Sequence, residues 1–108
     1  MYLDKYKGDI RTLCQQNKVR SLYVFGSVLT DKFSEKSDID LLVDIDSNDP
    51  MDYADNYFSL KFALQELFKR SIDLLESKAL KNPYIIENIN RSKSLIYGAL
   101  NKSLFKRY

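Results

Sequence analysis

The strongest constraint on the fold is an alternating stretch at residues 38–45, which reads DIDLLVDI. Ile39 and every second residue after it are apolar. The alternate positions start with two aspartates, Asp38 and Asp40. Successive side chains of a β-strand point to opposite faces. The stretch therefore predicts a strand with an apolar face toward the core and a second face that is acidic at its start.

The other segments supply neighbours for this strand. Helical spacing of apolar residues predicts helices over 4–17 and 51–69, and the loop 47–50 can cap the second of them. Residues that favour β-structure predict strands over 20–25 and 71–77. Pro83 is placed to begin a last helix, with an apolar face formed by Ile85, Ile86, Ile89, Ile96 and Leu100. Gly98 weakens that helix, so residues 94–98 are open to either helix or edge strand. We expect an α/β (α+β) fold, a small mixed β-sheet with helices packed on it.

Length and composition exclude several classes of function. The chain has 108 residues, so we expect one domain over 1–108 with no room for a substrate-binding domain. It has no histidine, which excludes serine–histidine and cysteine–histidine catalysis. The single cysteine, Cys14, and the absence of a signal peptide or membrane-spanning run indicate a cytoplasmic protein. The net charge of +2 is too small to argue for nucleic acid.

Three aspartates are candidates for metal binding. Asp38 and Asp40 are two residues apart on one strand, so their carboxylates point to the same side, where they repel each other unless a divalent cation lies between them. Asp73 lies in the next predicted strand and reaches the same volume if the two strands are neighbours. Three carboxylates on adjacent strands can hold two magnesium ions for in-line attack on a phosphate.

A Gly-Ser turn precedes the aspartates. Gly26 allows the backbone to approach a ligand closely, and amide groups beyond a strand end, together with the Ser27 hydroxyl, can bind phosphate oxygens. A phosphate-binding turn beside a metal site indicates chemistry on a nucleoside triphosphate or a phosphodiester.

Gly26-Ser27, Asp38-Ile39-Asp40 at the start of a strand and Asp73 in a later strand resemble the polymerase-β-like nucleotidyltransferase superfamily. Over nearly the whole chain the sequence is similar to its minimal nucleotidyltransferases (MNT proteins), which are often paired with HEPN-domain toxins. The resemblance implies a polymerase-β-like nucleotidyltransferase fold and a transferase that uses ATP and two Mg²⁺ ions.

The resemblance also implies a role for each residue. Gly26 and Ser27 would bind the β- and γ-phosphates, and Asp38 and Asp40 would bind both magnesium ions. Asp73 would bind the catalytic metal and help to deprotonate an acceptor hydroxyl, which attacks the α-phosphate as pyrophosphate leaves. The chain would then be an antitoxin that transfers AMP to a HEPN toxin.

The sequence departs from the family in one respect. Many members carry a basic residue within a few positions of the Gly-Ser pair, whereas here the nearest cations are Lys32 and Lys36. Whether either lysine binds the triphosphate is left open. Asp44 and Asp46, at the far end of the same strand, are expected to be solvated.

Two other functions stay open: a non-catalytic module that neutralises a toxin by contact, and the catalytic subunit of a small-molecule nucleotidyltransferase of the aminoglycoside-modifying kind.

A patch of Met51, Phe58 and Phe62 lies opposite the core stripe of the helix over 51–69. Either this patch contacts a partner protein or a second copy of the chain, or the C-terminal helix covers it.

Overall fold

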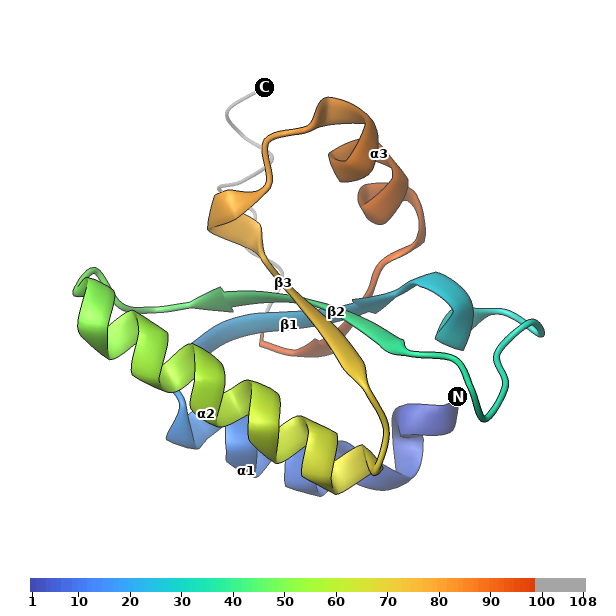
Figure 1. Ribbon diagram of the computed structural model, residues 1–108, viewed down its shortest axis with the longest axis horizontal. Helices are drawn as coiled ribbons and strands as arrows, with labels where there is room; N and C mark the ends of the chain where they lie inside the picture. The colour runs from blue at the N-terminus through green and yellow to red at the C-terminus, as the bar shows by residue number, and fades with distance from the viewer. Residues whose placement is uncertain (99–108) are drawn as a thin grey trace.

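The computed structural model describes residues 1–98, which form a four-stranded mixed sheet with helices on both faces (Figure 1). The strands are β1 (Val19–Phe25), β2 (Ile39–Ile45), β3 (Ile72–Glu76) and β4 (Ser94–Tyr97), in the order β3-β2-β1-β4. β1 is antiparallel to β2 and β4, and β2 is parallel to β3. The expected α/β architecture with a mixed sheet is confirmed.

Helices α1 (Lys7–Gln16) and α2 (Pro50–Phe68) lie together against one face of the sheet, whereas α3 (Pro83–Ser92) lies on the other side (Figure 1). α2 begins where the sequence predicts, because the Asp49 carboxylate accepts a hydrogen bond from the Met51 amide and Pro50 occupies the first turn. It ends at Phe68, and the C-cap residue Lys69 has a left-handed conformation. A 3-10 helix, Tyr2–Tyr6, precedes α1 where we expected the first helix to start.

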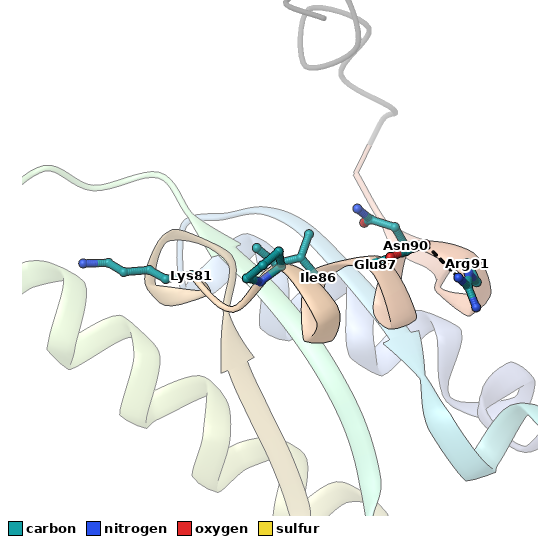
Figure 2. A pocket seen from close by; sticks show the side chains of 6 residues that line it. Lys81, Ile86, Glu87, Asn90 and Arg91 are labelled. Atoms are coloured by element: carbon teal, nitrogen blue, oxygen red, sulfur yellow. Dashed lines mark hydrogen bonds and ion pairs between the residues drawn. The ribbon is translucent and has the colours of Figure 1, made fainter.

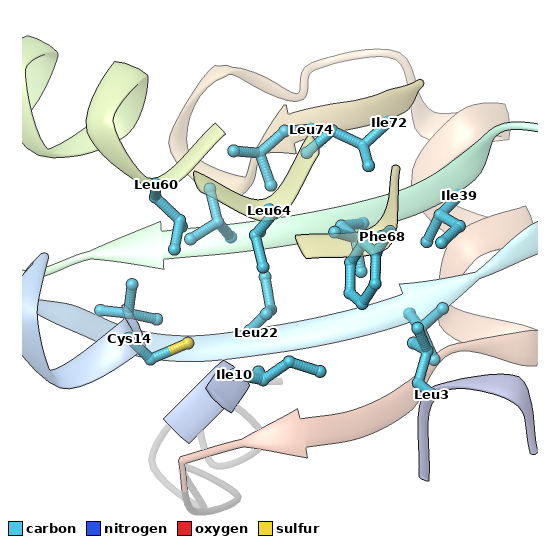
Figure 3. Packing of buried hydrophobic residues seen from close by; sticks show 14 of the residues in the cluster. Leu3, Ile10, Cys14, Leu22, Ile39, Leu60, Leu64, Phe68, Ile72 and Leu74 are labelled. Carbon is cyan, nitrogen blue, oxygen red and sulfur yellow. The ribbon is translucent and has the colours of Figure 1, made fainter. Parts of the chain in front are cut away.

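The hydrophobic core fills the space between the sheet and these two helices (Figure 3). β2 contributes its apolar face, with Ile39, Leu41, Val43 and Ile45 fully buried as the alternation predicts. Cys14 of α1 is also fully buried among them, and this burial raises the pKa of its thiol to about 12. The core therefore leaves the other face of β2, with its aspartates, free for another role.

Of the two alternatives left open for residues 94–98, the structure shows the edge strand. α3 ends at Ser92, and residues 94–97 form β4, so the single apolar helix face predicted from Ile85 to Leu100 is wrong. Ile96 packs on the core from β4, and Ile85 is exposed on α3, so they do not form one helical stripe. Gly98 has a φ of +98°, and a Cβ there would lie 2.4 Å from the Arg20 carbonyl oxygen, which favours glycine. Leu100 lies outside the described residues.

The predicted patch on α2 is exposed. Met51, Phe58 and Phe62 are 77%, 49% and 61% exposed, and the two phenylalanine rings stack with their centroids 6.1 Å apart. α3 does not cover them, because it lies on the opposite side of the sheet (Figure 1). An interface at this patch stays a prediction. No helix within residues 1–98 is both long enough and apolar enough to cross a membrane.

Candidate active site

The sheet brings Asp40 and Asp73 together. They are directly paired residues of the neighbouring parallel strands β2 and β3, and the Ile39 amide donates to the Ser71 carbonyl at the start of this pairing, at 3.2 Å. Because the side chains of paired residues project from the same face, both carboxylates lie on the face opposite the core. The sequence alone could place Asp73 near Asp40 only if the two strands were neighbours. The structure shows that β2 and β3 are neighbours.

Gly26 lies directly against Asp40. Phe25, the last residue of β1, pairs with Asp40, and the chain then turns into a 3-10 helix, η2 (Gly26–Leu29). The φ of Gly26 is +79°, and a Cβ at this position would lie 2.3 Å from Oδ2 of Asp40. The backbone conformation therefore favours glycine here, and any side chain would have to displace the Asp40 carboxylate.

Ser27 is held in η2 through its backbone. Its carbonyl oxygen accepts hydrogen bonds from the Thr30 amide at 2.9 Å and from the Thr30 hydroxyl at 2.8 Å. These contacts fix the turn without using the Ser27 hydroxyl. The candidate phosphate-binding residues Gly26 and Ser27 thus form one short, anchored turn beside Asp40.

Asp40 is electrostatically strained at this place. Burial raises the pKa of its carboxyl, and the charges of Asp73 and Asp38 raise it further. Asp38, exposed and one residue before β2, is therefore near enough to act on Asp40. The charges of Asp38 and Asp73 therefore both repel that of Asp40.

The donor set of these three aspartates suits a hard divalent cation. It consists of carboxylate oxygens, and none of the salt bridges formed within residues 1–98 involves Asp38, Asp40 or Asp73. Within the same residues, no three acidic, histidine or cysteine side chains are already gathered as closely as metal ligands are. Binding an ion here therefore requires the exposed carboxylates of Asp38 and Asp73 to turn toward Asp40.

Arg70 holds the loop that leads to Asp38, a role that the sequence did not reveal. Its guanidinium Nη1 donates to the carbonyl oxygens of Ser34 and Ser37 at 3.0 Å each. The guanidinium carbon also lies 4.8 Å and 4.5 Å from the ring centroids of Tyr2 and Phe33. Because Arg70 immediately precedes Ser71 and β3, it ties the loop before Asp38 to the strand that carries Asp73.

The far end of β2 differs from the prediction. Asp44 is not simply solvated, because Arg20 donates to its carboxylate at 3.2 Å and to that of Asp46, and the Lys78 ammonium lies 3.9 Å from Asp44. The aspartate side chains are 20% and 69% exposed, so only Asp46 is open to solvent to the degree expected. Two cations that are distant in sequence from this strand neutralise this end of it.

A separate hollow lies on the surface of α3 (Figure 2). It includes Lys81, Ile86 and the ion pair of Glu87 with Arg91, whose N and O atoms are 2.7 Å apart. None of the candidate residues lines it, and its rim is an ordinary pair of charges one helical turn apart. The hollow therefore does not belong to the candidate site.

Known proteins share this sequence pattern and this fold. A family model described as "Polymerase beta, Nucleotidyltransferase" matches residues 9–101. A Methanocaldococcus jannaschii protein named "Putative protein adenylyltransferase MJ0128" is 38% identical over 87 residues, which are 81% of this chain and 84% of that protein.

Two solved structures share the fold. A chain of a toxin–antitoxin structure with AMP-PNP has a TM-score of 0.70 and 19% identity, covering 92% of this chain and 78% of that chain. A chain in the complex of a tri-AMPylated Shewanella oneidensis HEPN toxin with MNT antitoxin has a TM-score of 0.63 and 18% identity, covering 92% and 75%.

The mixed sheet, the Gly-Ser turn and the family match together define the chain as a nucleotidyltransferase, an enzyme that transfers a nucleotide unit. It belongs to the polymerase β nucleotidyltransferase family. The resemblance inferred from the motif residues is thereby confirmed.

Proposed function

We propose that this nucleotidyltransferase transfers AMP from ATP to a hydroxyl group of a separate protein, in a Mg²⁺-dependent reaction. The observation that carries the proposal is the pairing of Asp40 with Asp73 next to the close-packed Gly26 turn, with Asp38 near enough to influence Asp40. This arrangement offers carboxylates for metal ions and backbone for phosphates at one edge of the open face of the sheet.

Each residue then has a role. Gly26 and Ser27 would hold the β- and γ-phosphates, and Asp38 and Asp40 would hold two Mg²⁺ ions. Asp73 would be a further ligand, and its carboxylate accepts the proton of the acceptor hydroxyl. The oxygen of that hydroxyl forms a bond to the α-phosphorus of ATP, the bond from this phosphorus to the bridging oxygen breaks, and pyrophosphate leaves.

The chain's own residues position the reactants for this displacement. When bound, the metal ions would neutralise phosphate charge and favour the in-line geometry. Gly26 allows the backbone close to Asp40, so phosphates on the turn lie near the carboxylates. Arg70 holds the loop before Asp38 and so limits where that carboxylate can lie.

We further propose that the acceptor is a HEPN-type toxin and that the protein is its antitoxin. Residues 1–108 then act as one nucleotidyltransferase domain, and the other protein supplies the hydroxyl. Support comes from the relative named as an adenylyltransferase of proteins and from the fold shared with a complex of MNT antitoxin and AMPylated HEPN toxin. The cytoplasm is the expected compartment, since ATP and a reduced Cys14 thiol are both found there.

Of the two other functions, the non-catalytic module is the less favoured one. A protein that acts by contact alone has no need to keep Asp38 and Asp73 where their charges repel Asp40, next to a glycine with a positive φ. The small-molecule enzyme uses the same site, so the choice between it and the proposed function rests on the acceptor.

The experiment that tests the proposal incubates the protein with its genetically neighbouring partner, labelled ATP and Mg²⁺, and then measures the intact mass of the partner. The expected result is a partner mass increased by one or more AMP units, which is lost without Mg²⁺ and with the Asp40→Asn variant. An unmodified partner that is still neutralised would support the non-catalytic module. Label on an added aminoglycoside would support the small-molecule enzyme.

A further inference from the structure

The structure places a lysine beside the Gly-Ser turn that is remote from it in sequence. Val24 of β1 pairs with Ser94 of β4, and the antiparallel register continued by one residue sets Lys93 opposite Phe25. Phe25 immediately precedes Gly26 and also pairs with Asp40 on its other side. Phe25, Asp40 and Asp73 form one row across β1, β2 and β3, and the continued register places Lys93, the residue before β4, at the end of this row.

Lys93 projects from the same face of the sheet as the carboxylates. Its ammonium group lies 4.4 Å from the centroid of the Tyr23 ring. Tyr23 lies between the buried residues Leu22 and Val24, so it points away from the core, as Asp40 does. Adjacent strands are about 4.8 Å apart, so the backbones of Lys93 and Asp40 are roughly 10 Å apart, with the start of the turn between them.

The charge of Lys93 is not balanced within the described part of the chain. Across residues 1–98 it forms no salt bridge, whereas the lysine at the far end of the sheet, Lys78, lies near Asp44. Partial burial lowers the pKa of the Lys93 ammonium. Lys93 also follows the last residue of α3, where a cation is favourable for the helix, and this explains its presence without a ligand.

We propose that Lys93 binds the β- and γ-phosphates of the nucleotide, as the cationic part of the phosphate site that Gly26 and Ser27 begin. This inference rests on the proposed function. It supplies the basic residue that is missing near the Gly-Ser pair in the sequence, because strand pairing brings it there from 67 positions further on. Lys32 and Lys36 are exposed in the loop that Arg70 holds, and they are the competing candidates.

The test compares binding of AMP-PNP and of AMP in the presence of Mg²⁺ by titration calorimetry. Lys93→Met keeps much of the aliphatic stem over Tyr23 and removes the charge, and Lys93→Arg restores the charge. Lys81→Met is the matched control, Lys32→Met and Lys36→Met test the two competing lysines, and melting temperatures confirm that each variant is folded.

Lys93→Met is expected to weaken AMP-PNP binding about tenfold to hundredfold, the range for a hydrogen bond to a charged group. AMP binding should change less than about threefold because AMP lacks the β- and γ-phosphates, and Lys93→Arg should recover most of the loss. Unchanged AMP-PNP affinity in Lys93→Met, an equal loss for AMP, or the larger loss in Lys32→Met or Lys36→Met would overturn the proposal.

A measurement on the unaltered protein does not depend on the folding of a variant. Amine-specific labelling followed by mass mapping should show that AMP-PNP with Mg²⁺ protects Lys93 and that AMP does not. Equal labelling of Lys93 with and without AMP-PNP would contradict the inference. If the unaltered protein fails to bind AMP-PNP at all, the proposed function itself fails, which is distinct from binding that does not involve Lys93.

Discussion

The two ends of the acidic face of β2 differ in how their charge is balanced. At the start of the strand, Asp40 faces Asp73 and Asp38, and none of the three forms a salt bridge within residues 1–98. At its end, Asp44 is bound by Arg20 and lies 3.9 Å from Lys78. Both ends carry aspartates, but cations surround the one at the end of the strand and other carboxylates surround the one at its start.

This difference separates a structural carboxylate from a candidate functional one. Pairing with Arg20 makes the Asp44 charge part of the folded state, and Asp44 in turn raises the pKa of Arg20. The charge of Asp40 instead opposes folding, because burial and two like charges raise its pKa. Within residues 1–98 no cation pairs with this charge, which suits a ligand that brings its own cation.

Asp40→Asn is expected to have the largest effect, a loss of AMP transfer of at least about a thousandfold. A metal site contributes several kcal/mol to such a reaction, and each 1.4 kcal/mol is about tenfold in rate. The melting temperature without Mg²⁺ should be unchanged or higher, since the substitution relieves repulsion. Intact-mass kinetics and thermal melts measure both. Undiminished transfer by a folded Asp40→Asn protein would disprove the metal-site assignment.

Ser27→Ala tests whether the turn beside this charged end is a phosphate site. We expect ATP affinity to fall by about 1.5–3 kcal/mol, roughly tenfold to 150-fold, because a hydrogen bond to a charged oxygen is lost. The fold should be retained, since the hydrogen bonds that hold the turn use the Ser27 carbonyl. Titration of both proteins with ATP and Mg²⁺ measures the change. Equal affinities would mean that the hydroxyl points away from the phosphates.

Asp44→Asn is the matched substitution at the paired end and should have the opposite pattern. AMP transfer should stay within about twofold of the unaltered protein, and the free energy of unfolding should fall by up to about 1 kcal/mol, as for partly exposed ion pairs. Chemical denaturation at low and high salt measures the loss, which should shrink at high salt as the pair is screened. A large loss of AMP transfer with unchanged stability would place Asp44 in the active site and contradict its assignment as a structural carboxylate.

The smallest effect is expected for Asp52, a fully paired carboxylate on α2. Hydrogen bonds from Lys18 and Ser47, and the Lys18 charge, lower the pKa of its carboxyl from the usual value. The ionised group therefore stabilises the folded state above the unfolded pKa, and this contribution is lost as the pH falls through the folded pKa. Melting temperatures of the unaltered protein and Asp52→Asn should differ slightly at pH 7, begin to converge below about pH 4, and become equal only below the lowered folded pKa. A difference that grows in acid would show that the pair does not stabilise the fold.

The local parts of the fold follow from sequence patterns. Alternation set the faces of β2, and the Asp49-Pro50 cap set the start of α2, because both signals depend on neighbours a few residues apart. For the C-terminal segment, helical spacing was a misleading signal. Apolar residues from α3 and β4 matched one helical spacing only because the two elements follow each other closely, and Gly98 was the one signal against it.

The sequence by itself determined which residues could carry the chemistry: the absence of histidine left carboxylates, and the spacing of Asp38 and Asp40 put them on one side of a strand. Three features were decided only by the tertiary structure. Asp73 pairs with Asp40, Arg70 holds the 34–37 loop, and the register of β4 brings Lys93 level with the Gly-Ser turn. Each of these contacts joins segments about 30 or more positions apart. Their partners are chosen by strand order and register, which the burial of a shared core selects and no local pattern encodes.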